Sequence, residues 1–315
     1  MLIKALLAPL FLNLSFRPTA VALLAAIAFL PAAARAGFSG LYVGDYTGSA
    51  DVVYQVPVSG GTPTVVDTFS AVDSLVFGPN GNLYVGDAGT ASIIEIQPNG
   101  STFTFATGVT SPASLAFDSS GNLFVSQNSL GNITEITPGD QQSVFASGLG
   151  AIHQIAFDSS GNLFVADSQH SVIDEFAPGN STPTVFTSAV VGPLGLAITA
   201  SGNIEVSDGN NGDIYSFTPS ATRTVFASGF TDPLTLALDP SGNLYVASFN
   251  DSDIIQITPG QQQSVFATGF NQPIALAYTP VPEPAVSTLM LALAGFLLSF
   301  LPRARRKLKL GRLHD

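Results

Sequence analysis

One short phrase, Gly-Asn-Leu-aromatic-Val, recurs through the middle of the chain, and this repetition restricts the possible folds more than any other feature. Its central aliphatic residue returns about every 40 residues, at Leu41, Leu83, Leu123, Leu163, Ile204 and Leu244. Each period holds four short runs of strand-forming residues, separated by turn signals such as DSSGN and TPG. Four-stranded units of roughly 40 to 45 residues are typical of β-propeller blades.

The two ends of the repeat region complement each other. The region begins with a second strand at 41–43 and ends with a first strand at 274–278. If these strands pair, they complete one composite blade and close the ring, which removes the exposed sheet edge. We therefore predict an all-β, six-bladed β-propeller of four-stranded antiparallel blades over 37–280, with an apolar helix at each chain end. A solenoid would leave the match between the end fragments unexplained.

Residues 1–36 are predicted to form a signal peptide. Basic residues precede an apolar run at 20–30, and an A-x-A motif at 34–36 places the cleavage between Ala36 and Gly37. An uncleaved membrane anchor is the alternative. If the segment is cleaved, the exported chain begins at Gly37.

The C-terminal segment, 281–315, carries a second targeting pattern. The residues Pro282, Glu283 and Pro284 precede an uncharged apolar stretch at 285–301, and an Arg-rich tail follows. The stretch is long enough for a short transmembrane helix, and the basic tail favours the cytoplasmic side, so the propeller is expected on the opposite face. A plain tail anchor would give the same placement.

The order of these three parts resembles the PEP-CTERM sorting signal of Gram-negative bacteria. The resemblance implies that an exosortase-type protease processes the tail. It also implies that the inner-membrane anchor is transient, with the propeller in the periplasm before delivery to the cell surface or extracellular matrix.

Charge and cysteine content exclude several classes of function. Between Gly37 and Pro280 the chain has one basic residue, Arg223, and twenty acidic ones, a net charge of −19 with His neutral. Such a surface repels phosphate backbones, so we expect no nucleic-acid partner. The absence of Cys excludes disulfides, thiolate metal sites and thiol nucleophiles.

The strings SPASLAFDSSGNLFVSQ (111–127) and IHQIAFDSSGNLFVAD (152–167) resemble the repeats of NHL and gluconolactonase-like six-bladed propellers. The resemblance covers the whole repeat region and implies the fold, but propellers host unrelated activities. The RNA-binding NHL domains have basic surfaces, which this region lacks. Streptogramin lyases share a similar strand phrase and use a His, but their ring has a different number of blades.

Gluconolactonase-like enzymes are divalent-metal hydrolases that hold the metal in the channel with Glu, Asn and Asp ligands, so the resemblance raises this activity as an alternative. The four Glu residues of the repeat region are not at expected channel positions. Three fall in the middle of third strands and the fourth replaces a Tyr or Phe of other units: Glu95, Glu135, Glu175 and Glu205.

The last residue of each second strand is acidic in four of the six units, at Asp45, Asp87, Asp167 and Asp208. One interpretation is a ring of carboxylates that binds a cation such as calcium. The other is a structural Asp that accepts hydrogen bonds from turn amides. The pattern favours the structural role, and the sequence requires no cofactor.

The first strands supply two further candidates, because these strands line the channel of a propeller. At one equivalent position the units have Asp73 and His153, whereas the other four have Ala, Leu, Leu and Ile. A His and a carboxylate near one channel could transfer a proton or hold a metal. Alternatively, both are hydrogen-bonded polar residues in a hydrated channel.

The sequence therefore predicts an exported propeller that acts as a binding or scaffold module for a polysaccharide or an envelope protein. A divalent-metal-dependent extracytoplasmic hydrolase or lactonase is the alternative, with Asp73 and His153 as candidate catalytic residues. A matrix-filling structural protein is a third possibility.

Overall fold

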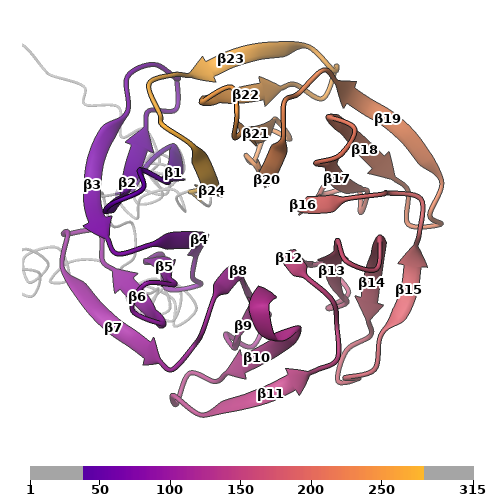
Figure 1. Cartoon of the computed structure of the whole chain (residues 1–315), viewed down its shortest axis with the longest axis horizontal. Helices are drawn as coiled ribbons and strands as arrows, with labels where there is room; N and C mark the ends of the chain where they lie inside the picture. Colours follow the sequence, from indigo (N-terminus) through magenta and orange to yellow (C-terminus); the bar gives the residue numbers. More distant parts are fainter. Residues whose placement is uncertain (1–37, 280–315) are drawn as a thin grey trace, which may run out of the picture. The chain divides into compact units, whose positions relative to one another are not determined.

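The computed structural model describes residues 38–279. The predicted signal peptide and its cleavage site, the sorting motif and both apolar end helices lie outside the described residues. Within 38–279, no helix is long and apolar enough to cross a membrane. The described part forms six antiparallel sheets of four strands each, arranged around a central axis (Figure 1).

Each blade contributes one strand to each of four concentric positions (Figure 1). The innermost strands are β4 (Val72–Phe77), β8 (Pro112–Phe117), β12 (Ile152–Phe157), β16 (Pro193–Ile198), β20 (Pro233–Leu238) and β24 (Pro273–Tyr278). The second strands are β1 (Leu41–Asp45), β5 (Leu83–Asp87), β9 (Leu123–Gln127), β13 (Leu163–Asp167), β17 (Ile204–Asp208) and β21 (Leu244–Ser248).

The two outer positions complete the blades. The third strands are β2 (Asp51–Val56), β6 (Ser92–Ile96), β10 (Asn132–Ile136), β14 (Val172–Phe176), β18 (Asp213–Phe217) and β22 (Asp253–Ile257). The outermost strands are β3 (Thr64–Phe69), β7 (Thr102–Thr107), β11 (Gln142–Ala146), β15 (Thr184–Thr187), β19 (Arg223–Ser228) and β23 (Gln263–Ala267). A short 3-10 helix, η2 (Asn128–Leu130), follows β9.

The composite blade predicted from the end fragments is confirmed. Strand β24 pairs with β1, with Leu41 opposite Tyr278 and Val43 opposite Leu276. The pairing extends beyond the strands, because the Gly40 amide donates to Thr279 Oγ1 at 3.1 Å and the Thr279 amide donates to Gly40 O at 3.0 Å. The first and last described strands thus share one sheet, β24-β1-β2-β3, and the ring is closed.

The recurring DSSGN phrase forms the turn between the first and second strands. In one copy, Asp118 Oδ1 accepts hydrogen bonds from the amides of Ser120 and Asn122, at 2.9 and 2.8 Å. Gly121 between them has a φ of +83°, a conformation in which a side chain is strained. Asp158 and Asp239 make the same bonds in their turns, so this Asp has the same structural role in all three copies.

The hydrophobic core lies between neighbouring blades. The second strands are buried along their whole length, and the aromatic residues of four repeated phrases contact an aromatic ring of the next blade: Tyr42, Tyr84, Phe124 and Tyr245. Tyr84, for example, makes edge-to-face contacts with Phe105 of its own blade and Phe117 of the next, with ring centroids 5.1 and 5.0 Å apart. Each such pair contributes about 0.5–1.5 kcal/mol beyond its area burial. The repeated phrase therefore holds the ring together as well as forming each blade.

Candidate functional site

Two rings of residues surround one end of the channel, which we call the channel mouth. The inner ring consists of the second residue of each innermost strand: Asp73, Ala113, His153, Leu194, Leu234 and Ile274. The outer ring consists of the residue after each second strand: Tyr46, Ala88, Asn128, Ser168, Gly209 and Phe249. All twelve side-chain positions are at least partly exposed to solvent.

The backbone places the two rings side by side. The amide of each outer-ring residue donates to a carbonyl in the segment that leads into the innermost strand of the same blade, as from Ala88 to Ala71 O at 2.8 Å and from Ser168 to Ala151 O at 3.0 Å. This frame is the same in all six blades, so the blades differ at the mouth in their side chains rather than in their backbone.

The strand-end acids fix these segments. Asp45 accepts hydrogen bonds from the amides of Asn271 and Gln272, the shortest at 2.9 and 2.8 Å. Asp87 accepts from the amides of Ala71 and Gly89 at 2.9 and 3.1 Å. Both carboxylates are buried, and each holds the loop before an innermost strand to the end of the second strand.

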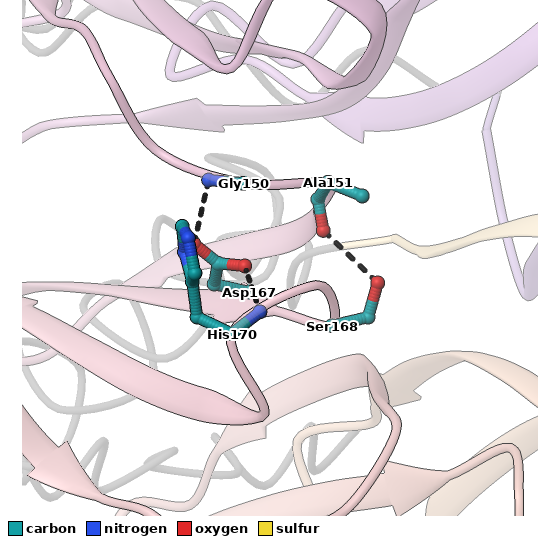
Figure 2. Close-up of polar contacts among 5 residues, drawn as sticks. All are labelled: Gly150, Ala151, Asp167, Ser168 and His170. Atoms are coloured by element: carbon teal, nitrogen blue, oxygen red, sulfur yellow. Dashed lines mark hydrogen bonds and ion pairs between the residues drawn. The ribbon is translucent and has the colours of Figure 1, made fainter.

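Asp167 makes bonds of the same kind with Gly150 and His170, and Figure 2 shows how these residues lie. Its carboxylate accepts from the amides of Gly150 and His170 at 2.7 and 3.0 Å, and His170 Nδ1 lies 2.8 Å from Oδ2. Burial opposes ionisation, but the bonds from His170 and Gly150 outweigh it and lower the pKa of Asp167. His170 itself lies on the surface, with its side chain 54% exposed.

Asp208 completes the set. It accepts from the amides of Asn210 and Asn211 at 3.0 and 3.3 Å, from Asn211 Nδ2 at 2.9 Å and from the Val191 amide at 3.3 Å. The four acids thus serve as caps in four separate blades. Within residues 38–279, no three His, Asp or Glu side chains are grouped so that they could hold a metal ion. The geometry supports the structural interpretation of these acids.

Asp73 differs from the strand-end acids because its carboxylate has no hydrogen bond or ion pair to any described residue. Burial, then repulsion from Asp51 and Asp87, raises its pKa to about 6. The neighbouring Asp51 is engaged, since it accepts from the Thr47 and Val72 amides at 3.0 Å. Asp73 is therefore a partly buried carboxylate that no group of the described protein neutralises.

His153 is also only weakly bonded. Burial lowers its pKa, against the opposing effect of Asp167. Its ring nitrogens lie 3.4 Å from Asn128 Nδ2, at the limit of hydrogen bonding. Within the described structure no hydrogen bond or ion pair joins His153 to Asp73. The two candidates share the mouth without forming an acid–base pair.

The mouth is polar on one side and apolar on the other. Three consecutive blades supply an apolar arc: Leu194, Leu234, Phe249, Ile274 and Tyr46. The other three supply a polar arc that contains Asp73, Asn128, His153 and Ser168, together with two alanines. The arcs meet at Asp73 and Ile274, because β4 and β24 pack against each other and Val72 and Ala275 share a core cluster with Ile274.

The sequence interpretation missed one residue that determines the depth of the mouth. The Gln154 side chain extends from β12 to two other blades, where its Oε1 accepts from the amides of Leu196 and Leu236, both at 2.9 Å. Its Nε2 donates to Leu236 O at 2.8 Å. Equivalent positions are small in the other blades: Ser74, Ser114, Gly195, Thr235 and Ala275. The sequence therefore did hold a signal, because Gln154 is the one long side chain at this position of the six innermost strands.

The Gln154 side chain crosses the channel below the inner ring, and we call this level the floor of the mouth. The residues that it contacts, Leu196 and Leu236, lie two positions after the inner-ring residues of the same strands, so this level is at most about 7 Å below the inner ring. The mouth is therefore a shallow cup. Two open pockets, of about 680 and 550 Å³, lie elsewhere, at the rim on either side of the composite blade.

Comparison with known proteins identifies the fold and leaves the family open. No family model and no curated protein matches the sequence. Among solved structures, the nidogen/laminin complex contains a chain that is 18% identical, with a TM-score of 0.65 and coverage of 76% of this chain and 98% of that one. At these identities the likeness shows the propeller fold alone.

Two lyases have the same general architecture. A streptogramin B lyase is 12% identical, with a TM-score of 0.53 and coverage of 74% of this chain and 75% of that one. An inactive variant of virginiamycin B lyase from Staphylococcus aureus, with quinupristin, is 13% identical, with a TM-score of 0.56 and coverage of 73% and 84%. The structural neighbours thus include both a protein found in a protein complex and enzymes.

Proposed function

We propose that the protein is an exported binding module and that the channel mouth is its binding face. The observation that carries the proposal is the contrast between a constant frame and a variable mouth. The backbone bonds and caps around the mouth recur in blade after blade, whereas its two rings contain charged, amide, aromatic and aliphatic side chains. A rigid scaffold that presents varied side chains from its loops is suited to recognition.

The strand-end carboxylates support this proposal because they already accept hydrogen bonds from backbone amides. A cation at Asp45, Asp87, Asp167 or Asp208 would have to displace some of these bonds, which stabilise the loops of the mouth. The nidogen/laminin structure supports it by analogy, since a propeller of similar fold occurs there in a complex with another protein.

The targeting patterns extend the proposal to location and partners. We propose that the signal peptide exports the chain and that the apolar segment 285–301 anchors it transiently in the inner membrane. An exosortase-type protease then delivers the propeller to the cell surface or matrix. Its ligand there is a polysaccharide or an envelope protein. The acidic repeat region supports the exclusion of nucleic acid.

Asp73 supports an enzymatic alternative, an extracytoplasmic hydrolase, lactonase or lyase. A carboxyl group with a pKa of about 6 at the mouth is suited to general base catalysis near neutral pH. The lyases among the structural neighbours are compatible with it. A panel of esters and lactones, with and without Ca²⁺, Mn²⁺ or Zn²⁺, tests this alternative. Turnover that Asp73→Asn abolishes would support it over the binding module.

The binding proposal is tested with the full-length protein in detergent. Binding is measured to exopolysaccharide and to envelope proteins from the source organism, for the wild type, Leu234→Asp at the mouth and Val185→Asp at the rim. Val185 is a matched control, because it is 61% exposed on outer strand β15. We expect at least tenfold weaker binding for Leu234→Asp alone. Tyr46→Ala, at an exposed mouth position, repeats the test if Leu234→Asp does not fold. Equal binding by both mouth variants contradicts the proposal.

A further inference from the structure

The negative charge at the mouth lacks a counter-charge from the described protein. Asp73 accepts no hydrogen bond there, and the nearby acids Asp51 and Asp87 repel its charge. Arg223, the one basic residue of the repeat region, is on outer strand β19. There its guanidinium lies 4.7 Å from the centroid of the Tyr215 ring and donates to Ala189 O. It is engaged at the rim, so the carboxylate at the mouth is available to an incoming cation.

A second acid lies on the apolar side of the mouth. The position of a Cβ on Gly209 would be 2.3 Å from Leu194 Cδ1 and 3.4 Å from Asp232 Oδ1, so Leu194 covers Gly209 with Asp232 beside it. Burial raises the pKa of Asp232, and among the described residues its side chain accepts one long hydrogen bond, from Asn250 Nδ2 at 3.5 Å. A cation that approaches the apolar arc therefore meets Asp73 beside its Ile274 end and Asp232 between the blades of Leu194 and Leu234.

The apolar arc restricts which cation fits. An inorganic ion would gain nothing from Leu194, Leu234 and Ile274, whereas a cation on an aliphatic stem buries the stem against them. Tyr46 and Phe249 add aromatic rings at the outer edge, on neighbouring blades. A guanidinium can stack on such a ring and pair with a carboxylate through two parallel hydrogen bonds, which an ammonium cannot do.

The depth of the mouth indicates the source of this group. Gln154 crosses the channel two strand positions, at most about 7 Å, below the inner ring, a depth that the end of one long side chain can fill. Small-molecule sites usually enclose most of their ligand, which a cup this shallow does not do. We propose that the mouth binds a protruding arginine of a partner protein, with its stem on the apolar arc and its guanidinium on Asp73. This rests on the proposed binding function.

The proposal is tested by methyl NMR on full-length protein in detergent, labelled at Leu and Ile methyl groups. The probes are acetylated, amidated tripeptides with Arg, Lys, norleucine or Glu between two glycines. We expect the Arg peptide to shift the Leu194, Leu234 and Ile274 methyl signals in a saturable way and to bind at least tenfold more tightly than the norleucine peptide. The Glu peptide should cause no shift. Added salt should weaken Arg binding.

Asp73→Asn should weaken Arg-peptide binding at least tenfold. Asp140→Asn is the matched control: it removes the same charge from the exposed turn between β10 and β11 and should leave binding unchanged. Equal affinity for the Arg and norleucine peptides, equal affinity for the Lys peptide, or no effect of Asp73→Asn overturns the arginine proposal.

Native material separates this proposal from the binding function. If exopolysaccharide or envelope proteins shift the same methyl signals and the Arg peptide does not, the mouth binds something else and only the arginine proposal fails. If exopolysaccharide, envelope proteins and the Arg peptide all leave these methyl signals unchanged, the proposed binding function fails as well.

Discussion

Replacing Gln154 with Leu tests whether the floor of the channel is a structural tie between blades. The substitution keeps a side chain of similar size and removes three hydrogen bonds, to the amides of Leu196 and Leu236 and to Leu236 O. Two backbone N–H groups lose their acceptor, and each buried group left without a partner costs about 1–3 kcal/mol. Some hydration from the mouth reduces this cost, so we expect a loss of about 3 kcal/mol.

Thermal and urea denaturation of the full-length protein measure this loss. For a domain of this size, 1 kcal/mol corresponds to about 2–4 °C, so the expected decrease in Tm is roughly 6–12 °C. Gln142→Leu is the matched control, because Gln142 is exposed on β11 and makes one bond, to Thr107 O at 3.1 Å. We expect less than about 0.5 kcal/mol for it.

A stability change below about 1 kcal/mol for Gln154→Leu would refute the reasoning, since it would mean that Leu196 and Leu236 do not depend on the amide. Gln154→Glu provides an independent check. A carboxylate can still accept from both amides, but it cannot donate to Leu236 O and would repel that carbonyl. The stability of Gln154→Glu should lie between that of the wild type and that of Gln154→Leu. It should increase as the pH is lowered and the carboxyl group is protonated.

Three other carboxyl groups give predictions that unfolding measurements at several pH values can check. Glu205 is buried, and its folded pKa of about 7 exceeds the unfolded value of 4.5. The free energy of unfolding should therefore fall by ~3 kcal/mol as the pH rises through this interval. Glu205→Gln should remove this decrease. Asp73→Asn should stabilise the protein at pH 8 but not at pH 4, because the folded pKa of Asp73 is raised to about 6. Asp167→Ala should cost about 1–3 kcal/mol at pH 7, because the Gly150 and His170 amides lose their acceptor. The pKa of Asp167 is lowered, so wild-type stability from this group should be lost at acidic pH as the pH falls through its folded pKa; a flat profile there would argue against the cap.

The repeat predicted the fold because its information is local and redundant. Each copy specifies strands, a Gly-Asn turn and an Asp that accepts turn amides, and six copies agree on the spacing. The composite blade was predictable for the same reason, since the two end fragments are parts of one repeat. Strand bounds were predicted less precisely, since β24 begins at Pro273, one residue before the predicted 274–278 strand.

The mouth could be predicted only in part. Comparison between blades identified Asp73 and His153 as exceptions in the inner ring, and the structure places both there. The comparison between blades could not show that Asp73 and His153 lack a direct contact, because that contact depends on how six blades meet around the axis. The roles of Gln154 and Glu205 depend on the same long-range packing. Gln154 reaches residues more than forty positions away, and Glu205 meets Ser216 in the interior at 2.9 Å.

The departures from the repeat differ in what they do to stability, and this difference separates candidate functional residues from structural ones. Gln154 adds bonds between blades, so folding alone accounts for it. Glu205 replaces an aromatic residue, is 4% exposed, and has one oxygen that finds no hydrogen-bond partner among residues 38–279, so it weakens the core where no ligand can reach it. Asp73 also weakens the folded protein when charged, but it faces the mouth, where a bound cation would offset the repulsion from Asp51 and Asp87. A destabilising group that a ligand can neutralise is the pattern expected of a binding residue. The pKa of Asp73 should therefore fall when the Arg peptide binds. A ¹³C titration of its carboxyl group that shows no decrease would contradict its role as the residue that binds the cation.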